Sequence, residues 1–240
     1  MQRVYFKKSR LYLGKIIMFV FAGGFLAACA LDVRGADFSD LFVDSAWLRG
    51  NQPSVTIVDA RAEKDFKKGH IPGAISAPWQ FFAHMEGKPG EPGWGNLLPP
   101  EELRAKLSSL GIDGSKPIVV YAYLPGWGED GRFAWMVKML GITDVKLLDG
   151  GYSAWKRDGG VTTREKTVIQ PGQPLQSQWD GELVADTDWI LSRTGQIRIV
   201  DSRAAREFSG ATPYGEARGG HLPGAVSIPF KDLFNADGRI

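Results

Sequence analysis

The 240-residue sequence has little cysteine and little histidine. Cys29 is the single cysteine, which excludes an internal disulfide and a metal cluster built on several thiolates. The three histidines, His70, His84 and His221, lie far apart in the sequence, so we expect no metal site and no cofactor. No basic stripe with interleaved aromatic residues is present, so we expect no nucleic-acid partner.

A long apolar run is also lacking at the N-terminus. Residues 16–28 are thirteen apolar or small residues, whereas a membrane-spanning helix needs about 20. Residues 1–15 carry five Lys and Arg and no acid, a pattern typical of a secretory signal. Residues 26–29 read LAAC and resemble the bacterial lipobox, in which cleavage precedes a cysteine that becomes lipid-modified.

These N-terminal features predict a lipoprotein signal peptide over residues 1–28 and lipidation of Cys29. The protein would then be anchored through Cys29 to a lipid membrane of the bacterial cell envelope, facing the periplasm or the cell surface. A plain signal peptide with an incidental cysteine, or a core thiol, are the alternatives.

The remaining 212 residues have ordinary globular character. The formal net charge of +2 loses five N-terminal positive charges and becomes about −3. The sequence has 43% hydrophobic and 23% charged residues overall, which is typical of a globular protein. Its length suggests one large or two small domains.

The chain contains an internal repeat. The stretch TIVDARAEKDFKKGHIPGAISAPW, from residue 56, returns from residue 198 as RIVDSRAAREF, then GGHLPGAVSIPF. Asp59 matches Asp201 at an offset of 142, and His70 matches His221 at 151, so the second copy carries nine extra residues between them. Two matched blocks in the same order indicate duplicated domains.

Strand-like and helix-like segments alternate along the first copy. Alternation of this kind predicts a parallel sheet covered by helices on both faces. Hydrophobic pattern and turn residues predict strands within 55–60, 70–78, 117–122 and 145–151, and helical segments within 61–69, 99–112, 132–141 and 152–159.

Two stretches show neither the hydrophobic period of a helix nor that of a strand. Residues 160–182 are rich in Gln, Pro and Gly and read as a linker. Residues 81–100 are an irregular insertion that forms either a lid or a plain surface excursion.

Several motifs together resemble a rhodanese domain. They are VDAR, GHIPGA, VVY before a glycine-containing loop, and LLDGG with Trp155 four residues beyond Gly151. The tandem arrangement is similar to the two-domain thiosulfate and 3-mercaptopyruvate sulfurtransferases. The resemblance implies an α/β fold of two tandem rhodanese-like domains with parallel sheets flanked by helices: residues 29–159, and a truncated second domain over 183–240.

The resemblance places the reactive group of the family directly after the central strand. There a cysteine thiolate takes up sulfane sulfur as a persulfide, helped by converging backbone N–H groups. Ala122 stands at that position, so the first domain is expected to be catalytically silent. The matching position of the second domain would be about residue 273, beyond Ile240, so we expect the chain to be a fragment or a frameshifted gene product.

A few charged residues are candidates for binding a substrate anion. Arg61 and Arg203 follow Asp59 and Asp201 at predicted strand ends, where each Asp could instead order loop amides and each Arg face solvent. Arg132 opens the predicted helix after the silent loop and could hold an oxyanion or lie in solvent.

Three further polar residues do not support catalysis or thiosulfate binding. Imidazoles in turns such as GHIPGA usually bond to backbone groups, so His70 and His221 are not expected to be catalytic. Glu207 stands before Phe208, where two-domain relatives often carry Arg, and would repel thiosulfate.

Two functions remain in competition. One is a sulfurtransferase that moves sulfane sulfur from thiosulfate or mercaptopyruvate to a thiol or cyanide acceptor. The other is an inactive rhodanese-like lipoprotein that binds small anions or a partner. A related phosphatase needs Cys-x5-Arg, which the loop after residue 121 lacks.

Overall fold

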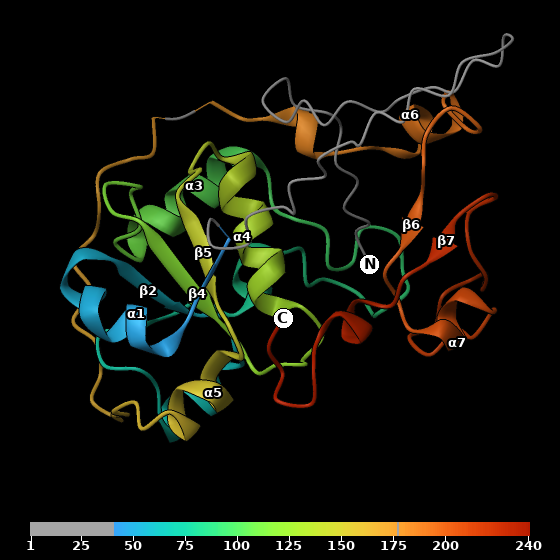
Figure 1. Cartoon of the computed structure of the whole chain (residues 1–240). Coiled ribbons are helices and arrows are strands. Elements are labelled where there is room, and N and C mark those ends of the chain that lie inside the picture. The colour runs from blue at the N-terminus through green and yellow to red at the C-terminus, as the bar shows by residue number, and fades with distance from the viewer. Residues whose placement is uncertain (1–40, 177) are drawn as a thin grey trace, which may run out of the picture.

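The computed structural model describes residues 41–176 and 178–240 (Figure 1). The predicted signal peptide over 1–28 and the predicted lipidation site Cys29 lie outside these residues. Within the described part of the chain, no helix has the length and apolarity needed to cross a bilayer.

The first repeat folds around a five-stranded parallel sheet. The strand order is β1-β5-β4-β2-β3, so β4 lies in the middle. All four residues of β4 are buried, as expected of a strand with helices over both faces. The strands are β1 (Phe42–Val43), β2 (Thr56–Asp59), β3 (Ile75–Ser76), β4 (Ile118–Tyr121) and β5 (Val145–Leu148).

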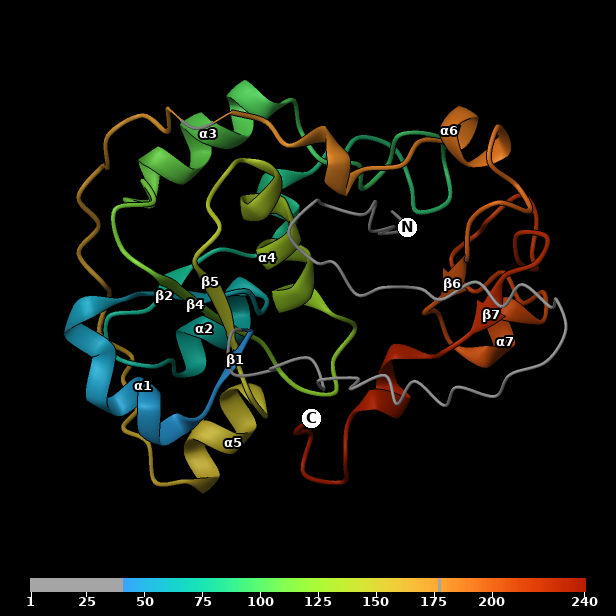
Figure 2. The ribbon, with the colours of Figure 1, turned by 45° about the horizontal axis from the view of Figure 1, so that its top comes forward.

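Helices cover both faces of this sheet, so the predicted parallel α/β fold is confirmed (Figure 2). Val58, Val120 and Leu147 pack on one side against α3 and α4. Ile57, Val119 and Leu148 pack on the other side against α1, α2 and α5. The helices are α1 (Ser45–Asn51), α2 (Glu63–Lys68), α3 (Pro100–Ser109), α4 (Glu129–Met139) and α5 (Gly151–Arg157).

Helix α4 starts earlier than the sequence pattern indicated. The expectation that Arg132 opens this helix is wrong, because the helix begins at Glu129 and Arg132 is its fourth residue. Gly128 has a left-handed φ of 94° at the N-cap, and Glu129 and Asp130 fill the first turn. Acidic residues stabilise the N-terminal end of a helix. The apolar pattern starts only after them, so it does not reveal the first turn of α4.

The second repeat builds the same strand–helix–strand unit. It contains α6 (Thr187–Leu191), β6 (Val200–Asp201), α7 (Ala205–Phe208) and β7 (Val226–Ser227). Strands β6 and β7 pair in parallel, with Val200 opposite Val226. The matching pair in the first repeat is Val58 opposite Ile75, so the two copies share their register as well as their motifs.

The segment between the repeats runs along the first repeat. Thr163 pairs with His70 in an antiparallel bridge. Leu175 is buried in the core against α3 and α4. Nearer the end of the linker, the Asp180 N–H donates to the Met139 carbonyl at 2.7 Å. The linker is therefore packed against this domain over much of its length.

Candidate functional site

The loop that joins β4 to α4 occupies the carboxyl end of the central strand. In open α/β sheets this edge is the usual place for chemistry. Ala122 begins the loop, its side chain is fully buried, and its carbonyl accepts a hydrogen bond from the Tyr152 N–H at 2.9 Å. A methyl group there can neither attack sulfur nor carry it.

The side chain of Glu129, the first residue of α4, accepts hydrogen bonds from backbone N–H groups at the end of this loop. Glu129 Oε2 accepts the Trp127 N–H at 3.2 Å. Burial raises the pKa of Glu129, opposed by hydrogen bonds from the N–H groups of Glu129, Trp127 and Gly128 and by the charge of Lys231. These three N–H groups therefore face a carboxylate of the protein itself rather than an external anion.

Arg61 lies inside the protein. Its guanidinium Nη2 is 2.6 Å from Asp59 Oδ2 and donates to the Gly69 carbonyl at 2.8 Å. Its Cζ lies 3.7 Å from the centre of the Tyr152 ring. Burial alone would lower the pKa of Arg61, but the hydrogen bond and the charge of Asp59 raise it.

Tyr121 completes this network from the end of β4. Its hydroxyl donates to Asp59 Oδ2 at 2.7 Å and accepts the Ile71 N–H at 3.2 Å. Only 1% of the Arg61 side chain is exposed. An anion would have to displace Asp59 to reach Arg61, so the geometry favours the structural alternative for this pair.

Arg203 repeats the arrangement in the second copy. Its Nη2 is 2.6 Å from Asp201 Oδ2 and donates to the Gly220 carbonyl at 2.7 Å. The side chain is 14% exposed. Arg203 is thus also paired with its aspartate, with somewhat more access to water.

Arg132 ties the 81–100 insertion to the start of α4. Its Nη2 donates to the Gly95 carbonyl at 2.6 Å, and its Cζ lies 5.2 Å from the centre of the Trp79 ring. Burial lowers its pKa. The insertion also closes on itself, because His84 and Asn96 form a backbone hydrogen bond of 2.8 Å.

The two matched histidines sit in equivalent aromatic stacks. The His70 ring lies 3.7 Å from the Phe66 ring, and the His221 ring lies 3.7 Å from the Phe208 ring. His70 Nδ1 and Nε2 contact the carbonyl oxygens of Phe66 and Glu165 at 3.0 and 3.1 Å. Among the described residues no group of three or more potential metal ligands occurs.

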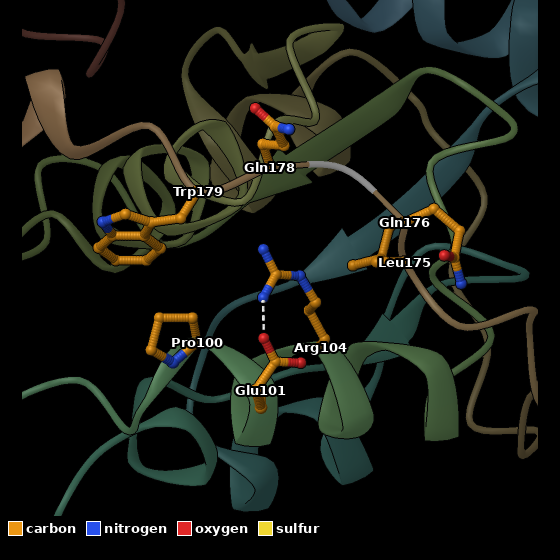
Figure 3. Close-up of a pocket in the computed structure, with 7 residues that line it drawn as sticks. All are labelled: Pro100, Glu101, Arg104, Leu175, Gln176, Gln178 and Trp179. Atoms are coloured by element: carbon orange, nitrogen blue, oxygen red, sulfur yellow. Dashed lines mark hydrogen bonds and ion pairs between the residues drawn. The ribbon is translucent and has the colours of Figure 1, made fainter.

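A shallow groove lies elsewhere, between the start of α3 and the linker (Figure 3). Its volume is about 510 Å³, and one wall carries an ion pair of 2.7 Å between Arg104 and Glu101. None of the residues singled out from the sequence lines it. The lining residues are Pro100, Glu101, Arg104, Leu175, Gln176, Gln178 and Trp179.

Sequence reasoning missed several members of the site. The tyrosines around Arg61 were not considered, although the parallel register places Tyr121 directly opposite Asp59. Glu129 also went unnoticed, and its folding back onto the Trp127 N–H depends on the loop conformation. A search for aromatic residues at the ends of adjacent strands could have found Tyr121.

A parallel sheet with a glycine-containing loop after its central strand, and a repeated Asp-x-Arg pair, defines a class of rhodanese-type domain. The sequence profile of the rhodanese-like domain matches residues 43–158.

Two relatives match a longer part of the chain than residues 43–158. "Probable 3-mercaptopyruvate sulfurtransferase" of Pseudomonas aeruginosa is 31% identical over 202 residues, covering 80% of this chain and 70% of the relative. Thiosulfate sulfurtransferase of Azotobacter vinelandii is 33% identical over 185 residues, covering 75% and 65%.

A solved structure agrees. The crystal structure of a 3-mercaptopyruvate sulfotransferase from Escherichia coli, which has the rhodanese fold, is 25% identical to this chain with a TM-score of 0.67. The match covers 83% of this chain and 78% of that chain. The chain therefore belongs to the rhodanese-like sulfurtransferase family.

Proposed function

We propose that this chain belongs to a sulfurtransferase that moves sulfane sulfur from thiosulfate or 3-mercaptopyruvate to a thiol or cyanide acceptor. Its nucleophile is a cysteine in the second repeat's counterpart of the loop after β4. With thiosulfate, the thiolate attacks the outer sulfur, the S–S bond breaks, and sulfite leaves with the electron pair. The acceptor then attacks the persulfide sulfur and releases the thiolate.

The observation that carries this proposal concerns β6, which within residues 41–176 and 178–240 pairs with β7 on one edge and with no strand on the other. The N–H groups of Val226 and Ile228 donate to the carbonyls of Ile199 and Asp201 at 2.9 and 3.0 Å. In a parallel ladder the backbone groups of Val200 then point to the opposite edge. In the first repeat that edge of β2 pairs with β4, the strand that leads into the loop.

The side chains at this edge support the same conclusion. Val200 is 41% exposed, whereas its counterpart Val58 is fully buried under α3 and α4. An exposed apolar side chain on an edge strand favours pairing of that strand with another one. A strand equivalent to β4 would place its following residue near Asp201, as Ala122 lies near Asp59.

The first test is a turnover assay on residues 1–240. We expect no thiocyanate above background from thiosulfate and cyanide, because Ala122 replaces the nucleophile and Cys29 belongs to the predicted lipidation site. The Cys29→Ala variant is the control. Thiocyanate formation that persists in this variant would contradict the assignment of the nucleophile to the second repeat.

The second candidate is an inactive rhodanese-like lipoprotein that binds a small anion or a partner. The observation that favours it is the first-repeat loop, where Ala122 is inert and Glu129 binds the backbone donors. The two candidates differ in the gene sequence past codon 240. A Tyr-Cys pair before a Gly-rich loop supports the enzyme, and its absence supports the binding module.

We also propose that Cys29 carries a lipid anchor in the bacterial cell envelope. Support comes from the basic segment, the short apolar run and the LAAC sequence. Processing sensitive to globomycin and partition into the detergent phase are expected. A mature form that stays in the aqueous phase would refute the anchor.

A further inference from the structure

His70 is enclosed between helix α2 and the linker, and it is only 1% exposed. Its Nδ1 lies 3.0 Å from the carbonyl oxygen of Phe66 in α2, and its Nε2 lies 3.1 Å from the carbonyl oxygen of Glu165 in the linker. A carbonyl oxygen only accepts hydrogen bonds, and a neutral imidazole carries a single N–H. Both contacts can therefore be hydrogen bonds only when the His70 ring carries two protons.

The second repeat indicates which of these two protons is permanent. His221 holds the matching position, and its Nδ1 lies 2.9 Å from the Phe208 carbonyl oxygen. His221 is exposed, and in the part of the chain that the structure describes its Nε2 has no hydrogen-bond partner. The contact that both copies share is the one at Nδ1, so the neutral ring keeps its proton there. In His70 the exchangeable proton is then the one on Nε2, which faces the Glu165 carbonyl.

Other contacts fix the linker in front of Nε2 (Figure 2). The backbones of Thr163 and His70 exchange two hydrogen bonds of 2.9 Å. The Thr167 hydroxyl donates to the Ala74 carbonyl at 2.7 Å. None of these bonds depends on the imidazole, so they bring the Glu165 carbonyl to Nε2 whether or not this nitrogen is protonated. A deprotonated Nε2 would set its lone pair against a carbonyl oxygen in a buried place, which is unfavourable.

The surroundings of His70 oppose and favour its charge in different ways. Burial by itself disfavours an imidazolium. The Phe66 ring favours one, because it lies parallel to the imidazole at 3.7 Å and its face attracts a cation. The two carbonyl oxygens add acceptors for both N–H groups. Two accepted hydrogen bonds and an aromatic face thus compensate the loss of water around the charged ring.

The other ionisable groups near His70 keep their charge state around neutral pH. Arg61 is paired with Asp59, and burial raises the pKa values of Tyr121 and Tyr152, so both hydroxyls stay protonated. Lysine, arginine and carboxylate side chains stay charged at neutral pH, whereas an imidazole ordinarily titrates roughly between pH 5 and 8. The remaining charged residues of α2 and of the linker next to His70 are Glu63, Lys64, Asp65, Lys67, Lys68, Arg164, Glu165 and Lys166.

We propose that His70 and the Glu165 carbonyl form a pH-dependent latch that holds the linker on the first repeat. Protonation of Nε2 adds a charged hydrogen bond to the linker, and loss of this proton turns the same contact into a repulsive one. Docking of the linker therefore takes up a proton, so the attachment strengthens as pH falls and weakens as pH rises. The latch does not depend on the proposed sulfur transfer, because it uses only the first repeat and the linker.

Amide hydrogen exchange of the full chain at about pH 5.5 and about pH 8 tests the latch. The quantity measured is the protection factor of Thr163, whose N–H donates to the His70 carbonyl. A protection factor already corrects for the effect of pH on the chemical exchange rate. We expect it to be roughly tenfold higher at the lower pH, the size of effect that a charge-assisted hydrogen bond gives.

Two variants of His70 separate the hydrogen bond from the proton. In His70→Gln the amide group replaces the Nε2–H without titrating, so Thr163 should be equally protected at both pH values. In His70→Asn the amide replaces the Nδ1–H and leaves the linker bond unmade, so protection should be low at both. His221→Asn is the matched control and should keep the pH dependence of the unaltered protein. Asp130 is present in all four proteins, so its own titration cancels in the comparison.

An unaltered protein without pH dependence at Thr163, or a His70→Gln variant that retains it, would overturn the latch. Nitrogen NMR of the unaltered protein with isotope-labelled histidine needs no variant. The His70 ring should carry protons on both nitrogens at the lower pH and on Nδ1 alone at the higher pH. The same protonation state at both pH values would overturn the proposal even if a variant failed to fold.

Discussion

Arg61 and Arg203 hold equivalent positions, yet they differ in how much they depend on their aspartate. Both pair with an Asp two residues earlier at 2.6 Å. Arg61 is almost fully enclosed and stacks on Tyr152, whereas Arg203 belongs to a two-stranded sheet and is 14% exposed. Removal of Arg61 would leave the Asp59 carboxylate buried without its counter-charge.

Arg61→Ala is therefore expected to lower the free energy of unfolding by about 3–5 kcal/mol, the usual cost of breaking a buried ion pair. Arg203→Ala, its matched control, should cost less because water reaches part of that site. Urea unfolding followed by tryptophan fluorescence measures both. Equal losses of unfolding free energy in the two variants would show that the contribution of Arg61 to stability does not come from its burial.

Asp130 gives the protein a pH-dependent stability. Burial raises its pKa to about 6 from the ordinary 3.8, while Oδ1 accepts the Gly131 N–H at 2.9 Å. Above pH 4 the unfolded chain has lost this proton and the folded protein still holds it. The free energy of unfolding therefore falls as pH rises from about 4 through 6.

Asp130→Asn should remove this penalty and keep the bond from Gly131. At pH 7 we expect a gain in unfolding free energy of about 2–3 kcal/mol, from a shift of roughly two pKa units. At pH 4 the variant and the unaltered protein should be nearly equal. Thermal unfolding at the two pH values checks this, and a gain independent of pH would contradict it.

Some residues of the site could be predicted from the sequence and others could not. Ala122 was placed correctly at the strand end, because the apolar run of β4 defines where the loop begins. The enclosure of Arg61 was not foreseeable from its neighbours in sequence. It arises from Tyr121 and Tyr152, which the parallel register and the α5 start bring to it.

At the scale of elements, the insertion 81–100 is a pinned surface segment. The sequence left a lid and a plain excursion as alternatives, since it has no period and many glycines. In the structure Arg132 binds Gly95, Trp79 contacts the rings of Trp94 and Trp127, and Gly90 meets the second repeat. These contacts are long-range and leave no pattern within the segment itself.

Arg132→Ala should weaken the attachment of residues 81–100 to helix α4. Loss of a charge-assisted hydrogen bond costs about 1.5–3 kcal/mol, so residues 84–96 should become sensitive to limited proteolysis. Lys138→Ala on the same helix serves as the control, because Lys138 lies two turns away from the loop. An unchanged cleavage pattern in Arg132→Ala would mean that the tryptophan contacts hold the segment without Arg132.

Most elements of the first repeat were predictable, including the two-residue β3 (Ile75–Ser76), which the GHIPGA turn indicates. Strands β2, β4 and β5, with four residues each, and helices α3 and α4 all produced recognisable hydrophobic patterns. Strand β1 has two residues and pairs at the edge beside β5, and α6 has five residues. Neither of these two elements is preceded by a recognisable turn motif, as β3 is, so no local pattern indicated them.

On the scale of the whole molecule, the duplicated sequence matters most. The two copies share the register of their strands, the Asp–Arg pair and the histidine stack. The repeats also contact each other, through Arg239 on one side and Gly90 on the other. A reaction site at the end of the second repeat's central strand would therefore lie close to the first repeat.

The central claim is that a cysteine of the second repeat carries the sulfur. The most direct measurement is to treat the full-length protein with thiosulfate and locate added sulfur by peptide mass spectrometry. The account predicts one extra sulfur atom on the cysteine that follows the second repeat's counterpart of β4, lost again when cyanide is added. Full-length protein that takes up no sulfur, or takes it up only at Cys29, would contradict it.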